Sequence, residues 1–242
     1  HVVELGAGSA LKSQILLRAV VRRQGRCLYL PVDVSGAALD GAVARLRREE
    51  PRVEVQPVQG THEQALPAIH DVGPRRLVLF VGSSIGNYED DEAVALLTEV
   101  GRVLRPGGGL LLGTDRKKDP SVLIPAYDDA QGVTAAFDLN LLVRLNRELG
   151  ADFALDRWRH EARWNEPRSR IEMHLVSTVD QTVSIPGIGA LAFAAGSSIH
   201  TESSHKYDHA HVDRLLGAAG FRRVRTFTDA AERFDVHLAA RR

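Results

Sequence analysis

Two glycines near the start of the chain stand where backbone could approach a cofactor. Gly6 and Gly8, in the run Glu4-Leu5-Gly6-Ala7-Gly8, follow a short apolar stretch and precede an amphipathic one. A glycine turn between a strand and a helix admits a ligand close to the backbone, and the helix N-terminus favours negative charge there. Asp33, which ends the next apolar run, can accept hydrogen bonds from both hydroxyls of a ribose. This spacing predicts a site for a nucleoside-containing cofactor.

Two cofactor classes use such a turn. A dinucleotide site requires a third small residue one helical turn further on, where this chain has Leu11. S-adenosylmethionine (SAM) has no pyrophosphate and is compatible with the bulkier residue. The turn Pro106-Gly107-Gly108-Gly109, placed before another apolar run, completes a pattern that favours SAM, with S-adenosylhomocysteine as product. The competing interpretation is that the two glycines form only a tight turn and that Asp33 caps a helix.

A second polar segment, Val81-Gly82-Ser83-Ser84-Ile85-Gly86-Asn87-Tyr88, follows the apolar run 76–81. In open parallel sheets, ligands collect at the carboxyl ends of the strands. The segment's glycines and small hydroxyls expose backbone groups, and Asn87 offers a donor and an acceptor without charge. We therefore expect a substrate-contacting loop. The alternative is that Asn87 caps the helix that follows.

Elements must place these residues at one edge of a sheet. We expect strands at 1–5, 26–32, 53–58, 76–81 and 110–114, and helices at 9–23, 35–49 and 90–104. Ser9 is predicted to cap the first helix, and its buried face is predicted to carry Leu11, Ile15, Leu16 and Val20. Strands that alternate with helices predict an α/β fold, a Rossmann-like class I methyltransferase sheet.

The alternation breaks after Asp115. Helices are expected at 121–127 and 132–148, and long alternating segments at 156–164 and 170–185 read as antiparallel strands. A helix at 209–219 and strands at 221–228 and 234–240 then close the sheet. The predicted organisation is a SAM-binding core over 1–116, an inserted α+β substrate-binding subdomain over 117–203, and a C-terminal part over 204–242 that completes the core sheet.

Composition excludes several classes of protein. Lys+Arg and Asp+Glu both number 31, so no net field draws the chain to nucleic acid or to an anionic membrane. The single cysteine, Cys27, precludes an internal disulfide and is expected in the core of a cytoplasmic protein. We expect a monomer that acts on a small molecule. The chain begins at His1, directly on a predicted strand, so further sequence is expected upstream.

Longer motifs carry a family resemblance. GSSIGNY, the block GTDRKKDPSVLIPAYDDAQGVTAAFDLNLLVRLNRELGADF and the later HTESSHKY together resemble the L-histidine Nα-methyltransferases of ergothioneine biosynthesis. The resemblance runs from Val2 to the end of the chain. It implies an enzyme, a SAM-dependent N-methyltransferase that methylates the α-amine of L-histidine towards hercynine.

The resemblance also implies roles for individual residues. The methyl donor is expected to contact Gly6, Gly8, Lys12, Asp33, Gly60 and Thr61. The amino-acid end of histidine is expected at Gly82, Ser84, Asn87 and Tyr127, of which Asn87 and Tyr127 are the candidate catalytic residues. Glu202 and Ser204 match the pair that holds the imidazole, and Met173 is expected to line the same pocket. A carboxylate at Glu202 can accept from an imidazole N–H.

The chain departs from the family in two places. The family has an acidic residue after the third-strand glycine to bind the adenine amine, whereas this chain has Gly60-Thr61-His62. The family's N-terminal tyrosine-bearing segment is also absent from this sequence. Two alternatives therefore stay open: a methyltransferase for another amino acid, such as a tryptophan derivative, and a non-catalytic SAM-binding domain. His200, His205, His209 and His211 have no fixed ligand spacing, so no metal site is predicted.

Overall fold

The computed structural model describes residues 1–69, 76–104 and 107–242, so Pro106 of the predicted turn lies outside the described residues. The chain divides into two compact units: a core unit, His1–Arg116 with Tyr207–Arg242, and an inserted unit, Lys117–Lys206. The insertion leaves the core unit after Arg116 and returns at Tyr207, and these two residues form an isolated parallel bridge.

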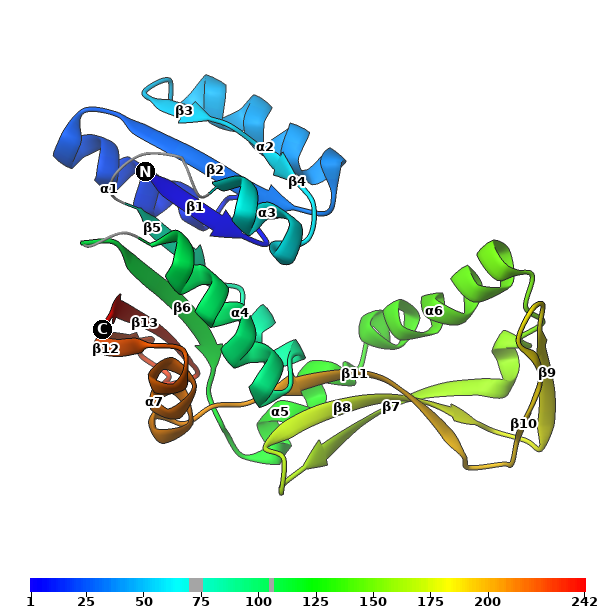
Figure 1. The fold of residues 1–242 in the computed structure, drawn as a ribbon. Coiled ribbons are helices and arrows are strands. Elements are labelled where there is room, and N and C mark those ends of the chain that lie inside the picture. The colour runs from blue at the N-terminus through cyan, green and yellow to red at the C-terminus, as the bar shows by residue number, and fades with distance from the viewer. Residues whose placement is uncertain (70–75, 105–106) are drawn as a thin grey trace. The chain divides into compact units, whose positions relative to one another are not determined.

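A single large sheet forms the centre of the core unit (Figure 1). Its strands run in the order β12-β13-β6-β5-β1-β2-β3, with β4 also paired to β2. The strands from β6 to β3 are parallel, and β13 and β12 add an antiparallel edge, which confirms the predicted α/β, Rossmann-like sheet. The strands are β1 (Val2–Leu5), β2 (Cys27–Asp33), β3 (Val53–Val55), β4 (Val58–Gln59), β5 (Leu77–Phe80), β6 (Gly109–Asp115), β12 (Phe221–Thr228) and β13 (Phe234–Arg241).

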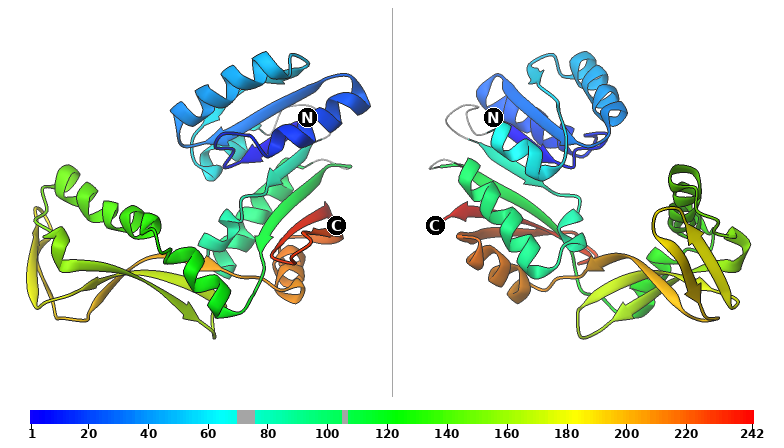
Figure 2. Two further views of the ribbon diagram at one scale, coloured as in Figure 1. Left: turned by 180° about the vertical axis from the view of Figure 1, so that it is seen from behind. Right: turned by 45° about the vertical axis from the view of Figure 1, so that its right-hand side comes forward.

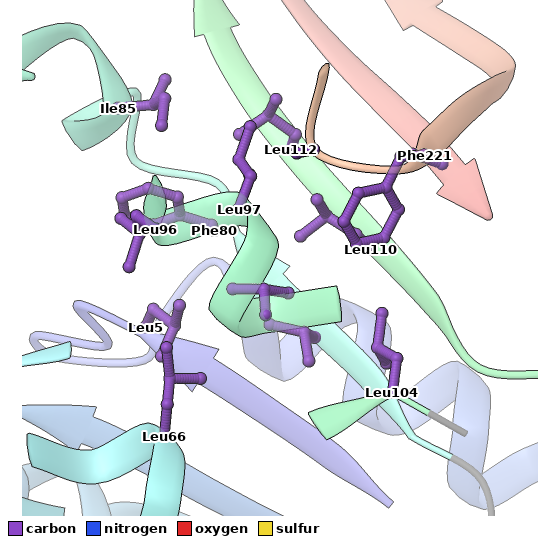
Figure 3. Packing of buried hydrophobic residues seen from close by; sticks show 14 of the residues in the cluster. Leu5, Leu66, Phe80, Ile85, Leu96, Leu97, Leu104, Leu110, Leu112 and Phe221 are labelled. Carbon is purple, nitrogen blue, oxygen red and sulfur yellow. The ribbon is translucent and has the colours of Figure 1, made fainter. Parts of the chain in front are cut away.

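Helices cover both faces of this sheet (Figure 2). Strand residues alternate between the faces: Val3 packs into the cluster formed with α3, α4 and α7, and Val2 packs into the cluster formed with α1 and α2. Figure 3 shows the first cluster, in which Leu97 of α4 lies over Leu110 and Leu112 of β6. The helices are α1 (Ser13–Gln24), α2 (Gly36–Glu49), α3 (His62–Ile69), α4 (Asp90–Val103) and α7 (His209–Ala218).

The predicted buried face of the first helix is wrong in part, because Leu16 and Val20 are partly buried and pack against the core. Leu11 is 59% exposed and Ile15 is 73% exposed, whereas Leu17 and Val21 are buried. The helix begins at Ser13 rather than after Ser9, and the Ser13 hydroxyl donates to the buried carboxylate of Glu4. Because residues four apart lie on one helix face, this anchor turns Leu17 and Val21 towards the sheet.

The inserted unit combines two helices with a three-stranded sheet and a hairpin. Trp158 and Leu175 of the sheet pack with Leu142 of α6 in its main apolar cluster. The predicted strand 170–185 is two strands separated by a turn, and β10 and β11 were not predicted. The elements are α5 (Pro120–Tyr127), α6 (Val133–Leu149), β7 (Trp158–Asn165), β8 (Arg170–Ser177), β9 (Gln181–Ile185), β10 (Gly189–Phe193) and β11 (Ser198–His205).

A β-bulge in β11 changes which face of the three-stranded sheet its residues occupy. His200 lies opposite His174 of β8, but Glu202 lies opposite Met173, because the register shifts between His200 and Glu202. Residues directly opposite each other in a sheet share a face. The bulge at Thr201 therefore places Glu202 on the face of buried Met173, and leaves His200 on the opposite face.

Candidate functional site

The glycine turn wraps the carboxyl end of β2. Gly6 and Gly8 have φ values of 69° and 49°, a left-handed conformation that glycine adopts without a side-chain clash. The N–H groups of Gly6 and Ala7 both donate to the carbonyl oxygen of Val32, at 2.9 and 3.0 Å. This arrangement fixes the turn beside Asp33, the last residue of β2.

Below the turn lies a buried carboxylate, Glu4, which accepts hydrogen bonds from the hydroxyls of Ser13 and Tyr29. Burial raises the pKa of Glu4, while the two hydroxyl donors act in the opposite direction. The network ties β1, β2 and the start of α1 together. Glu4 is thus an anchor for the turn, a role that the sequence analysis did not assign.

Asp33 uses both carboxylate oxygens to hold the loops around it. Gly8 N donates to Oδ2 at 2.8 Å, and Ser35 N donates to Oδ1 at 2.9 Å. Each carboxylate oxygen has a further lone pair, so Asp33 can accept two more donors. The competing interpretation, a helix cap, fails because α2 is capped by the side chain of Ser35, which accepts from Ala38 N at 3.2 Å.

A pocket of about 330 Å³ opens at this edge of the sheet. Lys12, expected at the donor site, lies outside its lining and is an exposed residue directly before α1. Wider hollows lie beside His1, at the opposite ends of the strands, where parallel sheets do not place their ligands. The residues lining the pocket are Gly6, Asp33, Val34, Gly60, Thr61, His62, Glu63 and Tyr88.

Thr61 and Glu63 line the same wall of this pocket. Thr61 also begins α3 with a capping box, because Gln64 N donates to its hydroxyl at 3.4 Å and Thr61 N donates to Gln64 Oε1 at 3.0 Å. The pKa of Glu63 is lowered by its own backbone N–H and by the Thr61 hydroxyl. The pocket therefore does contain an acidic residue, two positions after Thr61, where an acid was expected.

Aromatic rings form another wall. The His62 ring packs edge-on against Phe80, with 5.1 Å between ring centroids, and its Nδ1 lies 3.3 Å from the hydroxyl of Tyr88. Burial lowers the pKa of His62 and raises that of Tyr88. Both side chains are therefore uncharged near neutral pH, a surface suited to a flat heteroaromatic group.

The loop after β5 carries Gly82, Ser84 and Asn87, the last two within a 3₁₀ turn over Ser84–Asn87. Asn87 is exposed, and it does not cap the next helix: α4 begins with a capping box formed by Glu89 and Glu92. Two contacts fix the loop. Ser83 Oγ accepts from Asp115 N at 2.8 Å, and the buried Tyr207 hydroxyl donates to the carbonyl oxygen of Ile85 at 3.1 Å.

In the inserted unit, Tyr127 and Ser204 come together around a lysine that was not predicted. The Tyr127 hydroxyl lies 2.8 Å from Ser204 Oγ, and Lys206 Nζ donates to both oxygens at 2.7 Å. Lys206 is only 1% exposed, and its Nζ lies 4.6 Å from the centroid of the Tyr127 ring. The sequence signal was present but weak, since Lys206 directly follows β11 and is two residues beyond Ser204.

A buried pair supports Tyr127 from behind. His160 of β7 lies with Nε2 2.8 Å from the carbonyl oxygen of Tyr127 and with Nδ1 2.8 Å from Asp138 Oδ2 on α6. The two ring nitrogens thus face a carboxylate oxygen and a carbonyl oxygen. This chain of contacts fixes the end of α5 against β7 and thus the position of the Tyr127 phenol.

Glu202 and Met173 are cross-strand partners on the same face of the sheet as Ser204, which lies opposite Ile171. Met173 is buried, and Glu202 is partly exposed. The inserted unit thus gathers a carboxylate, a thioether, two hydroxyls and an ammonium group on adjoining elements. Such a set can hold a small molecule that has both N–H groups and an apolar ring.

Comparison with known proteins adds a decisive observation. The sequence pattern of the family described as histidine-specific methyltransferases, SAM-dependent, matches residues 1–241. The chain belongs to this family. The predicted resemblance, the enzyme class and the methyl donor SAM are thereby confirmed.

Relatives in the family share a large part of the sequence. The chain is similar to histidine N-alpha-methyltransferase of Mycobacterium tuberculosis, with 42% identity over 99% of this chain and 75% of the relative. The similarity to the Mycolicibacterium smegmatis protein of the same name is equal in identity and coverage. Among solved structures, a SAM-dependent methyltransferase from Clostridium acetobutylicum has the same fold, with a TM-score of 0.53, 11% identity, and coverage of 98% of this chain and 82% of the other.

One further finding concerns membranes. None of the helices among the described residues is both long and apolar enough to cross a bilayer.

Proposed function

We propose that this methyltransferase transfers the methyl group of SAM to the α-amine of L-histidine. The observation that carries the proposal is the whole-length family match, together with the position of Glu202 beside Met173 and Ser204 in the inserted unit. A carboxylate that shares a face with a buried thioether and a hydroxyl suits an imidazole ring, which is flat, partly apolar and carries an N–H.

The core unit is proposed to hold the donor. Asp33 accepts the two ribose hydroxyls, and the glycine turn admits the methionine portion close to its backbone. The rings of His62 and Tyr88 contact the adenine, and Glu63 accepts from the adenine amine in place of the acidic residue that Thr61 replaces. Lys12 is retained as a proposed donor contact at the start of α1.

Substrate contacts are proposed for each unit separately. In the inserted unit, Glu202 accepts from one imidazole N–H, Ser204 serves the other nitrogen, and Met173 contacts the ring. Tyr127 in the inserted unit, and the loop residues Gly82, Ser84 and Asn87 in the core unit, are proposed to bind the amino-acid end. Asn87 and Tyr127 are neutral, so they hold a carboxylate without adding charge near the amine.

The reaction itself is an in-line displacement. The lone pair of the neutral α-amine attacks the methyl carbon, the carbon–sulfur bond breaks, and S-adenosylhomocysteine leaves as a neutral thioether. The new ammonium group then loses a proton before any further transfer. Because no covalent protein intermediate is formed, alignment of the amine with the methyl group and exclusion of water provide most of the rate enhancement.

Substitution of Glu202 by Gln tests the proposal. The change keeps the shape of the side chain but removes its charge and one acceptor oxygen. The transition state with histidine should lose about 1–3 kcal/mol of stabilisation, so kcat/KM for histidine should fall roughly ten- to a hundredfold. Activity on amino acids without an imidazole should change little. Glu166→Gln is the matched control, because Glu166 is exposed and pairs with Lys117.

Three outcomes would contradict the proposal. An equal loss on every amino acid would mean that Glu202 supports the fold rather than the ring. Activity confined to an indole substrate would favour a tryptophan-type methyltransferase, and SAM binding without turnover on any amino acid would favour a non-catalytic domain.

A further inference from the structure

The face of the three-stranded sheet opposite Met173 carries a second cluster of polar side chains. Glu172 and His174 alternate along β8, and His200 of β11 lies directly opposite His174. The two imidazole rings stack at 5.0 Å between centroids, with 19° between their planes. One ligand atom from each of Glu172, His174 and His200 lies within 4.8 Å of the other two.

Each of these side chains is oriented by a contact to its other polar atom. His200 Nε2 lies 3.1 Å from the carbonyl oxygen of Glu202, a contact in which Nε2 must donate, so Nδ1 is the ring atom left to bind an ion. His174 Nδ1 lies 3.2 Å from Ser198 Oγ, and its Nε2 is directed at Glu172 Oε2, at 3.4 Å. Metal-binding histidines show this pattern, in which the second nitrogen bonds to a carbonyl or hydroxyl group.

Glu172 is held in the same manner. Its Oε1 accepts from Arg170 Nε at 2.8 Å and from Asn165 Nδ2 at 2.9 Å, which directs Oε2 towards His174. Burial opposes ionisation of Glu172, but the bonds from Arg170 and Asn165 outweigh it and hold its pKa at about 2. Burial and the charge of Arg163 lower the pKa of His174.

We infer that Glu172, His174 and His200 form a binding site for a divalent transition-metal ion. Two imidazole nitrogens and one carboxylate oxygen suit Zn²⁺, Ni²⁺ or Cu²⁺, whereas Mg²⁺ and Ca²⁺ prefer oxygen ligands alone. The exposed position of His200 leaves room for water as a fourth ligand. The guanidinium groups of Arg170 and Arg163 oppose binding of a cation, and each is paired with a carboxylate, Glu172 and Glu161 respectively.

Spacing along the chain gave no indication of this site, because its third ligand comes from another strand. The inference does not depend on the proposed methyl transfer, since none of the three residues has a role in it.

Titration calorimetry with zinc chloride alone, on the whole chain after treatment with a chelator, tests the site. We expect one Zn²⁺ per chain, and an affinity for Zn²⁺ that is at least tenfold lower in His200→Ala. Loss of a residue that only hydrogen-bonds to a metal ligand already lowers affinity by about tenfold or more, so loss of a ligand should cost at least as much. His200 is exposed, so this variant should fold, which circular dichroism checks. His209→Ala is the matched control, because it removes another partly exposed imidazole outside the inserted unit.

Two results would overturn the inference. One is zinc affinity that is the same in His200→Ala as in the unaltered chain, including no measurable binding by either. The other is an equal loss in His200→Ala and His209→Ala, which would show only that imidazoles in general collect the ion.

Discussion

Lys206 offers the sharpest test of how the inserted unit positions its side chains. Its ammonium group donates to Tyr127 and Ser204 at 2.7 Å each, and the side chain is almost fully buried. Substitution by Met keeps the length and apolar stem but removes every donor. The two hydroxyl groups, 2.8 Å apart, would then be held only by each other and by whatever they bind.

The expected effects on folding and on catalysis differ in size. A hydrogen bond from a charged donor contributes about 1.5–3 kcal/mol, but burial of an ammonium group costs several kcal/mol, so the two largely cancel in Lys206→Met. We expect the free energy of unfolding to change by no more than about 2 kcal/mol. Substrate binding has no such offset, because the orientation of both hydroxyls is lost, so kcat/KM for histidine should fall by roughly ten- to a hundredfold.

Steady-state kinetics with histidine and calorimetry with S-adenosylhomocysteine separate these effects. Because Lys206 lies in the inserted unit and the proposed donor contacts lie in the core unit, donor affinity should stay the same. Lys206→Arg, which keeps a buried cation, should recover part of the activity, and Lys117→Met should behave as the unaltered protein because Lys117 is partly exposed and pairs with Glu166. Unchanged kinetics with histidine in Lys206→Met, or parallel losses of donor and substrate binding, would refute the reasoning.

Three further predictions concern the core unit. Asp33→Ala removes a charged acceptor worth about 1.5–3 kcal/mol, so calorimetry should show donor affinity at least tenfold weaker; unchanged affinity in the folded variant would refute the ribose contact. Glu63→Gln should weaken donor binding in the same assay, whereas Thr61→Asp should leave it unchanged, because Glu63 already supplies an acid; tighter binding by Thr61→Asp would count against Glu63. Burial lowers the pKa of His237 from 6.5 to about 4. Between those pH values the imidazole is protonated in the unfolded chain but not in the folded one. The free energy of unfolding should therefore fall by at most about 3 kcal/mol as the pH drops from 6.5 to 4. In His237→Gln, thermal unfolding should no longer show this contribution to the pH dependence.

The sheet of the core unit could be predicted because its strands are buried on both faces and its helices are amphipathic. Runs such as Leu77–Phe80 are apolar without interruption, a pattern typical of parallel strands that helices cover on both faces. The face of α1 could not be predicted in this way. Ser13, which donates to the buried carboxylate of Glu4, lies on the buried face with Leu17 and Val21, and a polar residue on that face interrupts the apolar periodicity that would predict it.

Candidate site residues were predictable where a motif fixes them and not where strand pairing does. The glycine turn and Asp33 could be placed from spacing alone, since both follow apolar strands directly. Lys206 and the Glu172, His174 and His200 cluster depend on which strands pair and on the bulge at Thr201. One extra residue in a strand moves each later residue of that strand to the other face of the sheet. The sequence of β11 does not indicate where this extra residue lies.

The bridge between Arg116 and Tyr207 has a consequence for how such an enzyme can be altered. The last residue before the insertion and the first residue after it already lie side by side, and Tyr207 N donates to the carbonyl oxygen of Asp115 at 2.9 Å. The ninety residues between them therefore begin and end at adjacent points of the core unit, so their removal would leave no gap in its backbone to span. A short glycine linker across the two ends would join the core into a continuous domain, and a different insert could be grafted at the same point. On the proposed assignment of sites, exchange of the inserted unit should change the substrate and leave the donor contacts of the core unit in place.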